Sequence, residues 1–173
     1  MTESQWVRFD WPLSGCAFPL PDVPGYRLRP AGPGDVDAML DVVRAAYASD
    51  PVWRDLGADI ERRVAARIRE SLGDPGAHFV VAERGPDIVG LNGVALDHPT
   101  AQNLITGICV LPEHQGRGLG TALLSASLAW LRDQGLRTAT VTTDARAIAA
   151  RVYRHFGASR TDGVAYADAP RTS

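Results

Sequence analysis

Three glycines at alternate positions, Gly116, Gly118 and Gly120, separate an apolar, strand-like segment from the start of a helix. Because glycine has no Cβ atom, such a loop lets backbone N–H groups approach a ligand closely. The helix that follows adds unpaired N–H donors and the positive end of its dipole. The spacing therefore predicts a site for a phosphate or pyrophosphate group, held mainly by the backbone.

Two other kinds of nucleotide-binding loop fit this segment poorly. The P-loop requires a lysine after its second glycine, and all 18 basic residues of this chain are arginines. A Rossmann loop requires Gly-x-Gly-x-x-Gly directly after a strand, with an acidic residue roughly 20 positions later. Asp144 would suit that acidic position, but the glycines have the wrong spacing and residues 111–115 come before them. A dinucleotide-binding oxidoreductase is thus only a distant alternative.

A third pattern, Gln/Arg-x-x-Gly-x-Gly/Ala, matches residues 115–120 in full. With this loop the chain resembles the GCN5-related N-acetyltransferase (GNAT) superfamily. Asp87-Ile-Val-Gly90 is similar to the start of a strand in that family, and residues 149–157 are similar to its Ala-x-x-x-Tyr-x-x-x-Gly helix. The resemblance spans about residues 25–166, and the three stretches in this order are far more specific than the glycine loop alone.

The resemblance implies that the phosphate-bearing ligand is acetyl-CoA or another short acyl-CoA. The loop amides would hold its pyrophosphate, and a splayed strand edge before the loop would pair with the pantetheine amides. The implied cofactor contacts are Ile108, Cys109, Val110, Gln115, Gly116, Arg117, Gly118, Leu119, Gly120, Thr121, Arg146 and Ala149. Arg146 departs from the family pattern, because many relatives carry asparagine seven residues before the tyrosine.

The implied reaction is direct transfer of the acetyl group to a primary amine of a small molecule, and Tyr153 matches the position of the general acid. A tyrosine, with a reference pKa near 10, stays protonated at neutral pH and can donate a proton to a leaving thiolate. Tyr153 also lies on an apolar helix face. Burial in the core is therefore the competing interpretation.

The general base is not identifiable from the sequence. Asp97, His98 and Glu113 are the candidates, and each lies in a segment expected to be a loop. A proton path through water, or an acceptor that arrives neutral, would need none of them. Because the base is unidentified and the asparagine is missing, an acyl-CoA-binding sensor module without catalytic activity is the main alternative function.

The composition narrows the class of partner and the compartment. The net charge is −2 and the pI is about 6.1, so the chain has no strong attraction for nucleic acid or an anionic membrane. No apolar run is long enough to cross a bilayer. Two cysteines, Cys16 and Cys109, give neither a disulfide framework nor an expected metal site. The first residues do not resemble a signal peptide, and the cytoplasm is the expected location.

The acceptor side is less specified. In the GNAT superfamily it is shaped by the first two helices and by loops that correspond to residues 50–58 and 97–103. Four acidic residues in these regions would suit a cationic amine: Asp50, Asp55, Asp59 and Asp97. Four arginines on the second helix are expected mainly to form a solvated face, with acceptor or phosphate binding as the lesser alternative: Arg62, Arg63, Arg67 and Arg69.

The elements that must position these residues follow from hydrophobic periodicity. Strands are expected at residues 26–29, 77–83, 88–96, 103–110 and 137–143, with one more in the tail 158–173; helices are expected at about 36–47, 59–72, 118–134 and 145–156, the first with Asp35 as its N-cap. A strand–helix–strand crossover late in the chain implies parallel pairing there. Together with the resemblance, this predicts an α/β fold of GNAT type. It is a mixed, mostly antiparallel sheet with helices on both faces and a splayed edge between residues 103–110 and 137–143.

Residues 1–24 are expected to lie apart from the acyltransferase domain at 25–173. The prolines that follow Trp11 disfavour regular structure, whereas the aromatic residues argue against disorder. An extended arm on the domain surface or on a second subunit is predicted. The short tail leaves the last strand of the fold missing or supplied by a partner chain. The N-terminal arm and the C-terminal strand are therefore the two candidate contacts of a homodimer.

Overall fold

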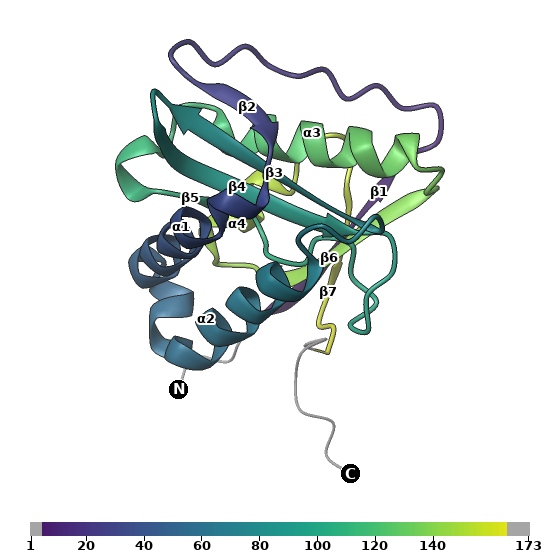
Figure 1. Ribbon diagram of the computed structural model, residues 1–173. Helices are drawn as coiled ribbons and strands as arrows, with labels where there is room; N and C mark the ends of the chain where they lie inside the picture. Colours follow the sequence, from purple (N-terminus) through teal and green to yellow (C-terminus); the bar gives the residue numbers. More distant parts are fainter. Residues whose placement is uncertain (1–4, 166–173) are drawn as a thin grey trace.

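The computed structural model describes residues 5–165, and its strands form two sheets (Figure 1). The first sheet has the order β2-β3-β4-β5. Its strands are β2 (Arg27–Pro30), β3 (Ala77–Arg84), β4 (Asp87–Ala95) and β5 (Cys109–Val110). The second sheet has the order β6-β1-β7. Its strands are β6 (Thr138–Asp144), β1 (Trp6–Pro12) and β7 (Ser159–Asp162).

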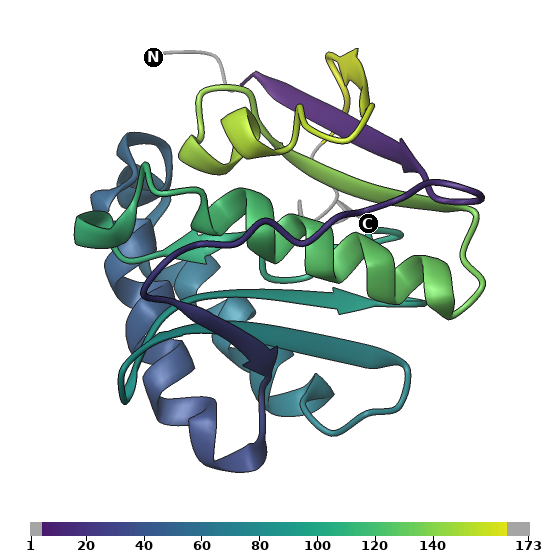
Figure 2. The same cartoon turned by 90° about the horizontal axis from the view of Figure 1, so that it is seen from above.

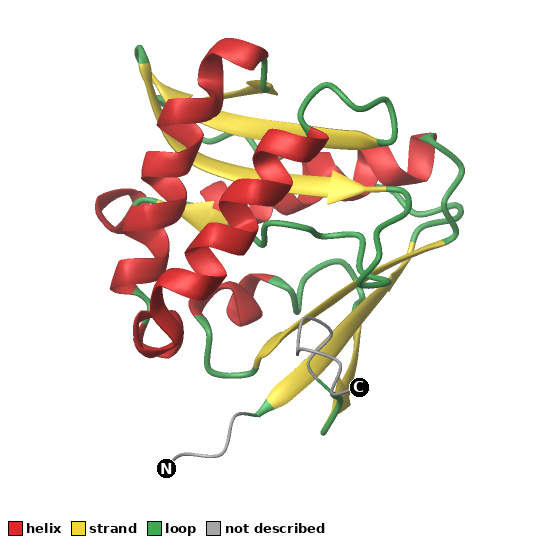
Figure 3. Cartoon of the chain, turned by 60° about the horizontal axis from the view of Figure 1, so that its bottom comes forward, coloured by secondary structure: helices red, strands yellow, loops and turns green. Residues whose placement is uncertain are grey.

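The helices of residues 5–165 are α1 (Val36–Ser49), α2 (Pro51–Ser71), α3 (Leu119–Asp133) and α4 (Ile148–Val152), with short 3-10 turns η1 (Pro33–Asp35) and η2 (Pro112–His114). The first three cover the two faces of the first sheet. Figure 3 shows α1 and α2 in front of this sheet and α3 behind it. The predicted α/β class with helices on both faces is confirmed. Within residues 5–165, no helix combines the length and apolar character needed to cross a membrane.

Strand β1 corrects the expectation of an N-terminal surface arm. It pairs with β6 along its whole length and with β7 on its other side, so it is the central strand of its sheet. Its side chains alternate, with Val7, Phe9 and Trp11 fully buried between more exposed neighbours, as a strand with one face on a core requires. The prolines do not disrupt this alternation, because the first of them, Pro12, is the last residue of the strand.

The rest of the N-terminal segment, between β1 and β2, is extended along the domain surface. Figure 2 shows it crossing the outer side of α3 between β1 and β2. Two polar contacts attach it to that helix: Ser125 donates to the Pro19 carbonyl over 2.7 Å, and Arg132 donates to the Cys16 carbonyl over 2.8 Å. The strand expected to be missing or supplied by a partner is thus provided by the chain's own N-terminal segment.

The two sheets meet at one end and separate at the other. Near β6 they are joined by Asn103, whose N–H donates to the Thr140 carbonyl over 2.9 Å and whose side-chain oxygen accepts from the Thr140 N–H over 3.0 Å. Toward β5 no such hydrogen bonds continue between the described strands of the two sheets. There α4 lies between the diverging strands β5 and β6 (Figure 3). The predicted splay is therefore present. The expected parallel pairing is absent, because every ladder between the described strands is antiparallel and β5 and β6 share none.

The strand expected at residues 103–110 is interrupted by Gly107. Only an isolated bridge at Leu104 and the two residues of β5 pair with β4. Gly107 has φ +70°, a left-handed conformation that is unfavourable for residues with a Cβ atom. A glycine within an apolar strand pattern is a signal for such an irregularity. This interruption opens the edge of the first sheet beside β6.

Helix α2 begins earlier than predicted, so residues 51–58 are helical rather than a loop. Pro51 is the first residue of α2, a position that suits a fixed φ and a missing N–H. Asp50 caps the helix by accepting from the Val52 N–H over 2.9 Å. Asp35, by contrast, makes no side-chain cap to α1, because its carboxylate binds Arg29 and the Gly32 N–H.

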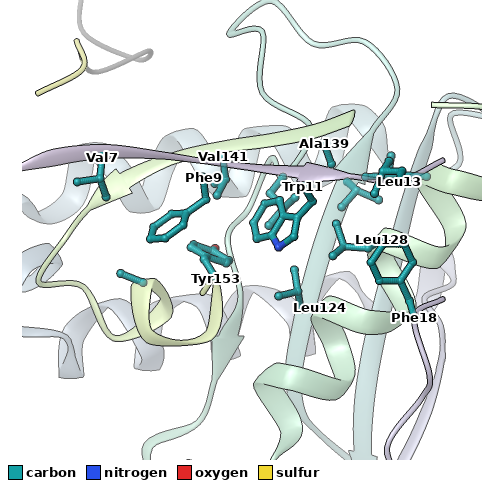
Figure 4. Packing of buried hydrophobic residues seen from close by; sticks show 14 residues of the cluster. Val7, Phe9, Trp11, Leu13, Phe18, Leu124, Leu128, Ala139, Val141 and Tyr153 are labelled. Carbon is teal, nitrogen blue, oxygen red and sulfur yellow. The ribbon is translucent and has the colours of Figure 1, made fainter. Parts of the chain in front are cut away.

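The core beneath β1 contains Tyr153, which directly follows α4 (Figure 4). The Tyr153 ring lies 5.9 Å from the ring of Phe9 and 5.8 Å from that of Trp11, measured between centroids. The Trp11 indole N–H donates to the His155 carbonyl over 2.9 Å. The N-terminal strand therefore fixes both the ring of Tyr153 and the backbone next to it.

Candidate active site

A cleft of about 280 Å³ lies where the two sheets separate. Its walls come from α1 and α2 on one side, from the glycine loop and α4 on the other, and from the irregular segment 102–110 and β6 between them. The cleft thus has two halves that meet near Gly107, Ile108 and Tyr153. Because β5 and β6 are edge strands of different sheets, each has backbone groups on its edge that pair with no other described strand.

The glycine loop forms one end of the cleft. Gly116 and Gly118 have φ values of +73° and +88°, and Gly118 is the N-cap of α3 without any side-chain cap. The first backbone bond of the helix runs from the Ala122 N–H to the Gly118 carbonyl, so the N–H groups of residues 119–121 have no partner within the helix. These donors and the helix dipole fit a pyrophosphate, as the sequence predicted.

Gly120 has a different reason to be glycine. A Cβ atom there would lie 3.0 Å from the Val152 side chain and 3.7 Å from that of Ile108. Its absence lets α3 pack closely against α4, which brings the loop next to the strand edge. Leu119, Thr121 and Ala149 line the same part of the cleft.

Replacing Gly118 with alanine is expected to raise KM for acetyl-CoA about tenfold or more, with a small loss of stability. The left-handed backbone costs about 1–2 kcal/mol for a residue with Cβ, and one displaced charge-assisted hydrogen bond accounts for the affinity. Gly135→Ala is the matched control, because Gly135 follows the other end of α3 with φ +94° and open space around it. Equal KM values for the two variants would contradict the role of the loop. Initial rates against acetyl-CoA concentration measure both.

Two side chains of the loop play parts that the sequence did not reveal. Gln115 donates to the Val110 carbonyl over 3.1 Å, which ties the loop to the end of β5. Arg117 is exposed, and its guanidinium lies 3.5 Å from the Glu113 carbonyl. Neither side chain is thus among the N–H donors at the start of α3, and Arg117 is not among the residues that line the cleft.

The edge of β5 that faces away from β4 borders the cleft. The Leu111 N–H donates to Val89 of β4, so the alternate residues Ile108 and Val110 direct their backbone groups toward the cleft. The side chain of Cys109 is buried on the other side, and burial raises the pKa of its thiol to about 12. The thiol therefore stays protonated at neutral pH and does not act as a nucleophile.

Tyr153 is 1% exposed in the core, as its competing interpretation predicted, and it is also among the residues that line the cleft. The hydroxyl accepts from the Ile108 N–H over 3.1 Å. Burial raises the pKa of Tyr153 well above its usual value, so the group carries its proton at any physiological pH.

Gly107 also lines the cleft, which the sequence did not predict. A Cβ atom at this position would lie 3.3 Å from the Tyr153 hydroxyl and 3.8 Å from that of Tyr47. Tyr47 approaches from α1 and donates to the Thr106 carbonyl over 2.8 Å. Two tyrosines from opposite halves of the cleft thus converge on one glycine, where a reacting group could pass between the sheets.

The three candidate bases do not line the cleft. Asp97 and Glu113 are exposed, and His98 bonds Thr100 of its own turn over 2.7 Å. Asp50 is the only carboxylate among the described lining residues. Its second oxygen accepts from the Ile148 N–H over 2.9 Å, so it joins the starts of α2 and α4.

Replacing Asp50 with alanine is expected to destabilise the protein by about 2 kcal/mol, because it removes a helix cap and leaves two backbone donors without their acceptor. The displacement of α4 should also lower the turnover number. Asp55→Ala, an exposed position on the same helix, should change stability by no more than about 0.5 kcal/mol. Urea denaturation compares the two; similar midpoints for both variants would show that Asp50 does not hold the helices.

Arg146 lies apart from the cleft lining and is engaged by Asp144. Its guanidinium makes two bonds of 2.9 and 2.8 Å to that carboxylate. Although burial alone would raise the pKa of Asp144, the hydrogen bonds from Arg146 lower it overall. Asp144 is therefore not available to a ribose. The antiparallel ladders also argue against the Rossmann alternative, which requires parallel strands.

The arginines of α2 divide between two faces. Arg62 and Arg69 are exposed, whereas Arg63 and Arg67 are partly buried and line the cleft. The expectation of one solvated face is therefore wrong for half of this group. Helical periodicity could have predicted this division. Arg63 and Arg67 flank the apolar stripe of the helix, whereas Arg62 and Arg69 lie opposite it.

This arrangement is an α/β fold with two sheets and a cleft between them, bordered by a glycine loop at the start of a helix. The chain belongs to the acetyltransferase (GNAT) family, whose model matches residues 40–158. The family predicted from the three sequence stretches is confirmed.

Three similar proteins illustrate the relationship. A mycothiol acetyltransferase of Pseudarthrobacter chlorophenolicus is 34% identical over 145 residues, which cover 80% of this chain and 44% of the relative. The chain thus spans about half the length of the curated relatives that it matches. A GCN5-related N-acetyltransferase from Sphaerobacter thermophilus has a TM-score of 0.65 at 21% identity, covering 95% of this chain and 54% of the other. A GNAT family acetyltransferase from Brucella melitensis in complex with acetyl-CoA has a TM-score of 0.50 at 23% identity, covering 65% and 71%.

Proposed function

We propose that this protein is an N-acetyltransferase that moves an acetyl group from acetyl-CoA, or another short acyl-CoA, to a primary amine of a small molecule. The observation that carries the proposal is the cleft itself. The glycine loop lines one half of this cleft, α1 and α2 line the other, and Tyr153 is also among its lining residues. The acetyl-CoA bound by the Brucella relative and the acetyltransferase names of other relatives support the choice of donor.

The residues of the chain would act mainly by positioning. Amides of residues 116–121 hold the pyrophosphate, and the edge at Ile108 and Val110 aligns the pantetheine arm. Bound acetyl-CoA supplies an acetyl group activated as a thioester. Holding it beside the acceptor supplies much of the rate acceleration. The Ile108 N–H donates to the Tyr153 hydroxyl. When that hydroxyl turns toward the leaving sulfur, the N–H would instead donate to the developing oxyanion.

Tyr153 would supply the proton that the leaving thiolate needs, since burial keeps its hydroxyl protonated. The amine proton would leave through water, because Asp97, His98 and Glu113 do not line the cleft and the oxygens of Asp50 accept from backbone N–H groups. Arg146 would act as a structural partner of Asp144 rather than as a cofactor contact.

An acyl-CoA-binding sensor without activity is the remaining alternative. Release of the CoA thiol, followed colorimetrically with a panel of primary amines and acetyl-CoA, separates the two functions. The panel should include the acceptor for which the mycothiol acetyltransferases are named. Release that depends on an amine supports the enzyme. Tight CoA binding without release for any amine supports the sensor, and binding of NAD in place of CoA would revive the oxidoreductase.

We retain the cytoplasm as the proposed location, consistent with two cysteines that form no disulfide. A homodimer through β7 is also retained as a proposal, because β7 is an edge strand of its sheet. Arg160 and Asp162 on this strand oppose the proposal, because charged side chains discourage the pairing of edge strands. Size-exclusion chromatography with light scattering measures the oligomeric state.

A further inference from the structure

The cleft contains a buried side-chain amide that the proposed reaction does not use. Gln102 lies at the start of the irregular segment and lines the cleft, although it is only 6% exposed. Its Oε1 accepts from the Thr142 N–H of β6 over 2.7 Å. Because a backbone N–H can only donate, this bond fixes which end of the amide faces β6 and leaves the NH2 group at the other end.

The NH2 group of Gln102 has no partner among residues 5–165, since the side-chain amide makes its one bond to Thr142. Within the same residues, the side-chain atom that is both fully occluded and without a partner is Asn92 Oδ1. The Gln102 Nε2 atom therefore keeps access to the cleft that its residue lines. Because burial of an unpaired donor is unfavourable, such an amide indicates a ligand that supplies the acceptor.

The position of Gln102 separates it from the donor arm. The segment that follows it pairs with β4 first at Leu104, opposite Val94. It pairs again at Val110, opposite Gly90, and four residues of a strand span about 13 Å. The glycine loop begins beyond Val110, whereas Gln102 comes before Leu104. Gln102 thus lies at the end of the segment away from the pyrophosphate site, where the second substrate would bind.

Two other polar side chains of the acceptor half are engaged by the chain itself. Tyr47 donates to the Thr106 carbonyl, and both oxygens of Asp50 accept from backbone N–H groups. The other carboxylates that could have suited a cationic amine are exposed and do not line the cleft: Asp55, Asp59 and Asp97. The expected preference for a cationic acceptor is therefore not supported by these four residues.

Helix α2 adds apolar surface to the same half. Trp53, Ile60 and Val64 line the cleft, and the Trp53 ring packs edge-on against that of Tyr47, with centroids 5.9 Å apart. Small-molecule sites typically combine such apolar walls with a few polar groups that fix the orientation of the ligand. The Gln102 amide is placed to be one of these polar groups.

We propose that Gln102 is a specificity residue of the acceptor site, and that the acceptor is an amine that also carries a hydrogen-bond-accepting oxygen, in a hydroxyl or a carbonyl group. The NH2 group of Gln102 donates to this oxygen, and the hydrocarbon part lies against Trp53. The amine is thereby directed to Gly107, beside Tyr153. Hydroxyl and carbonyl oxygens offer the same acceptor chemistry. This inference rests on the proposed transferase function and names its substrate class.

Matched pairs of acceptors test the proposal. Linear amino alcohols of increasing chain length are compared with alkylamines in which a methyl group replaces the hydroxyl. Glycinamide and β-alaninamide are compared with isobutylamine and isopentylamine, in which an isopropyl group replaces the amide. At least one oxygen-bearing member should exceed its apolar partner about tenfold or more in kcat/KM, because a site built to bond an oxygen discriminates against the analogue that lacks it.

Gln102→Glu separates recognition from a structural role. Its carboxylate can still accept from the Thr142 N–H, but at about pH 8 it has no donor for the substrate. The kcat/KM ratio within that pair should fall about tenfold, and it should also fall in Gln102→Met, which lacks both groups. KM for acetyl-CoA should not change in either variant. Gln134→Glu, at an exposed position after α3, is the control for added charge and should keep the wild-type ratio.

A structural role alone predicts a different pattern. If Gln102 only holds β6, the ratio should be unchanged in Gln102→Glu, which keeps the bond to Thr142, and any loss should be confined to Gln102→Met. That result would overturn the proposal.

Calorimetric titration of the same compounds into the CoA-saturated protein distinguishes failure of this inference from failure of the transferase function. Binding of an oxygen-bearing member that depends on Gln102, without thiol release for any amine, would retain the recognition site and reject the enzyme. Transfer to amines with the same ratio in wild type and in Gln102→Glu would reject the recognition site and retain the enzyme. If the oxygen-bearing members neither bind nor react, the inference is wrong.

Discussion

Replacing Tyr153 with phenylalanine is expected to lower kcat about 100-fold while leaving the affinity for CoA unchanged. The substitution removes one hydroxyl, which bonds the Ile108 N–H and lines the cleft, and general acids contribute about 10²- to 10⁴-fold to a rate. The ring stays in place between Phe9 and Trp11, so the loss of stability should be about 1 kcal/mol, the value of one hydrogen bond. Steady-state kinetics and calorimetry with CoA measure the two parts.

Tyr47→Phe is the matched control for this prediction. Its hydroxyl also bonds the irregular segment, at the Thr106 carbonyl, but from the opposite half of the cleft. If the Tyr153 effect came only from loosening Gly107, both variants would lose kcat equally. A general acid role predicts a much larger loss for Tyr153→Phe. Because burial raises the pKa of Tyr153, wild-type kcat should also show no loss of an acid as the pH rises to about 10, the ordinary tyrosine value.

Replacing Trp11 with alanine is expected to destabilise the protein by about 3–5 kcal/mol, the range for deleting a large buried aromatic side chain. Trp11 is 0% exposed, and its indole donates to the His155 carbonyl. The substitution opens a cavity against the ring of Tyr153 and frees the chain after α4. Activity should therefore fall even under conditions where the variant remains folded, although Trp11 does not line the cleft.

Arg8→Ala gives the comparison on the same strand, because that side chain is exposed and its ion pair with Asp10 lies at the surface. Its effect should stay within about 0.5 kcal/mol. Urea denaturation followed by tryptophan fluorescence and circular dichroism measures both variants. A Trp11→Ala protein as stable as Arg8→Ala would show that β1 is an accessory arm, as the sequence first suggested.

The parts of the candidate site that could be predicted from the sequence are those marked by short, contiguous sequence motifs. The glycine loop combines backbone conformation and helix start within six residues, and Tyr153 lies within a nine-residue helix pattern. Gly107, Asp50 and the divided arginines required knowledge of which elements face one another. Gly107 matters because Tyr47 and Tyr153 approach it from distant parts of the chain. Asp50 matters because Ile148 lies 98 positions away.

The three base candidates are not among the residues that line the cleft, and the reason is related. Asp97, His98 and Glu113 follow strands in the sequence, but proximity along the chain does not fix the direction of a side chain. Strand β1 was missed because its partners, β6 and β7, are at the other end of the chain, and an isolated alternating segment among prolines gives little indication of them. Long-range pairing is the information that periodicity lacks.

The central place of β1 has a consequence for how this protein is made. Trp11 meets its partner His155 only 144 positions later, so β1 leaves the ribosome long before β6, β7 or Tyr153 exist. At about 5–20 residues per second, it waits on the order of ten seconds with an apolar face uncovered. Loops of this length also slow the search for the native pairing. Synthesis rate and chaperone supply should therefore govern the yield of folded protein, and with it the number of assembled active sites.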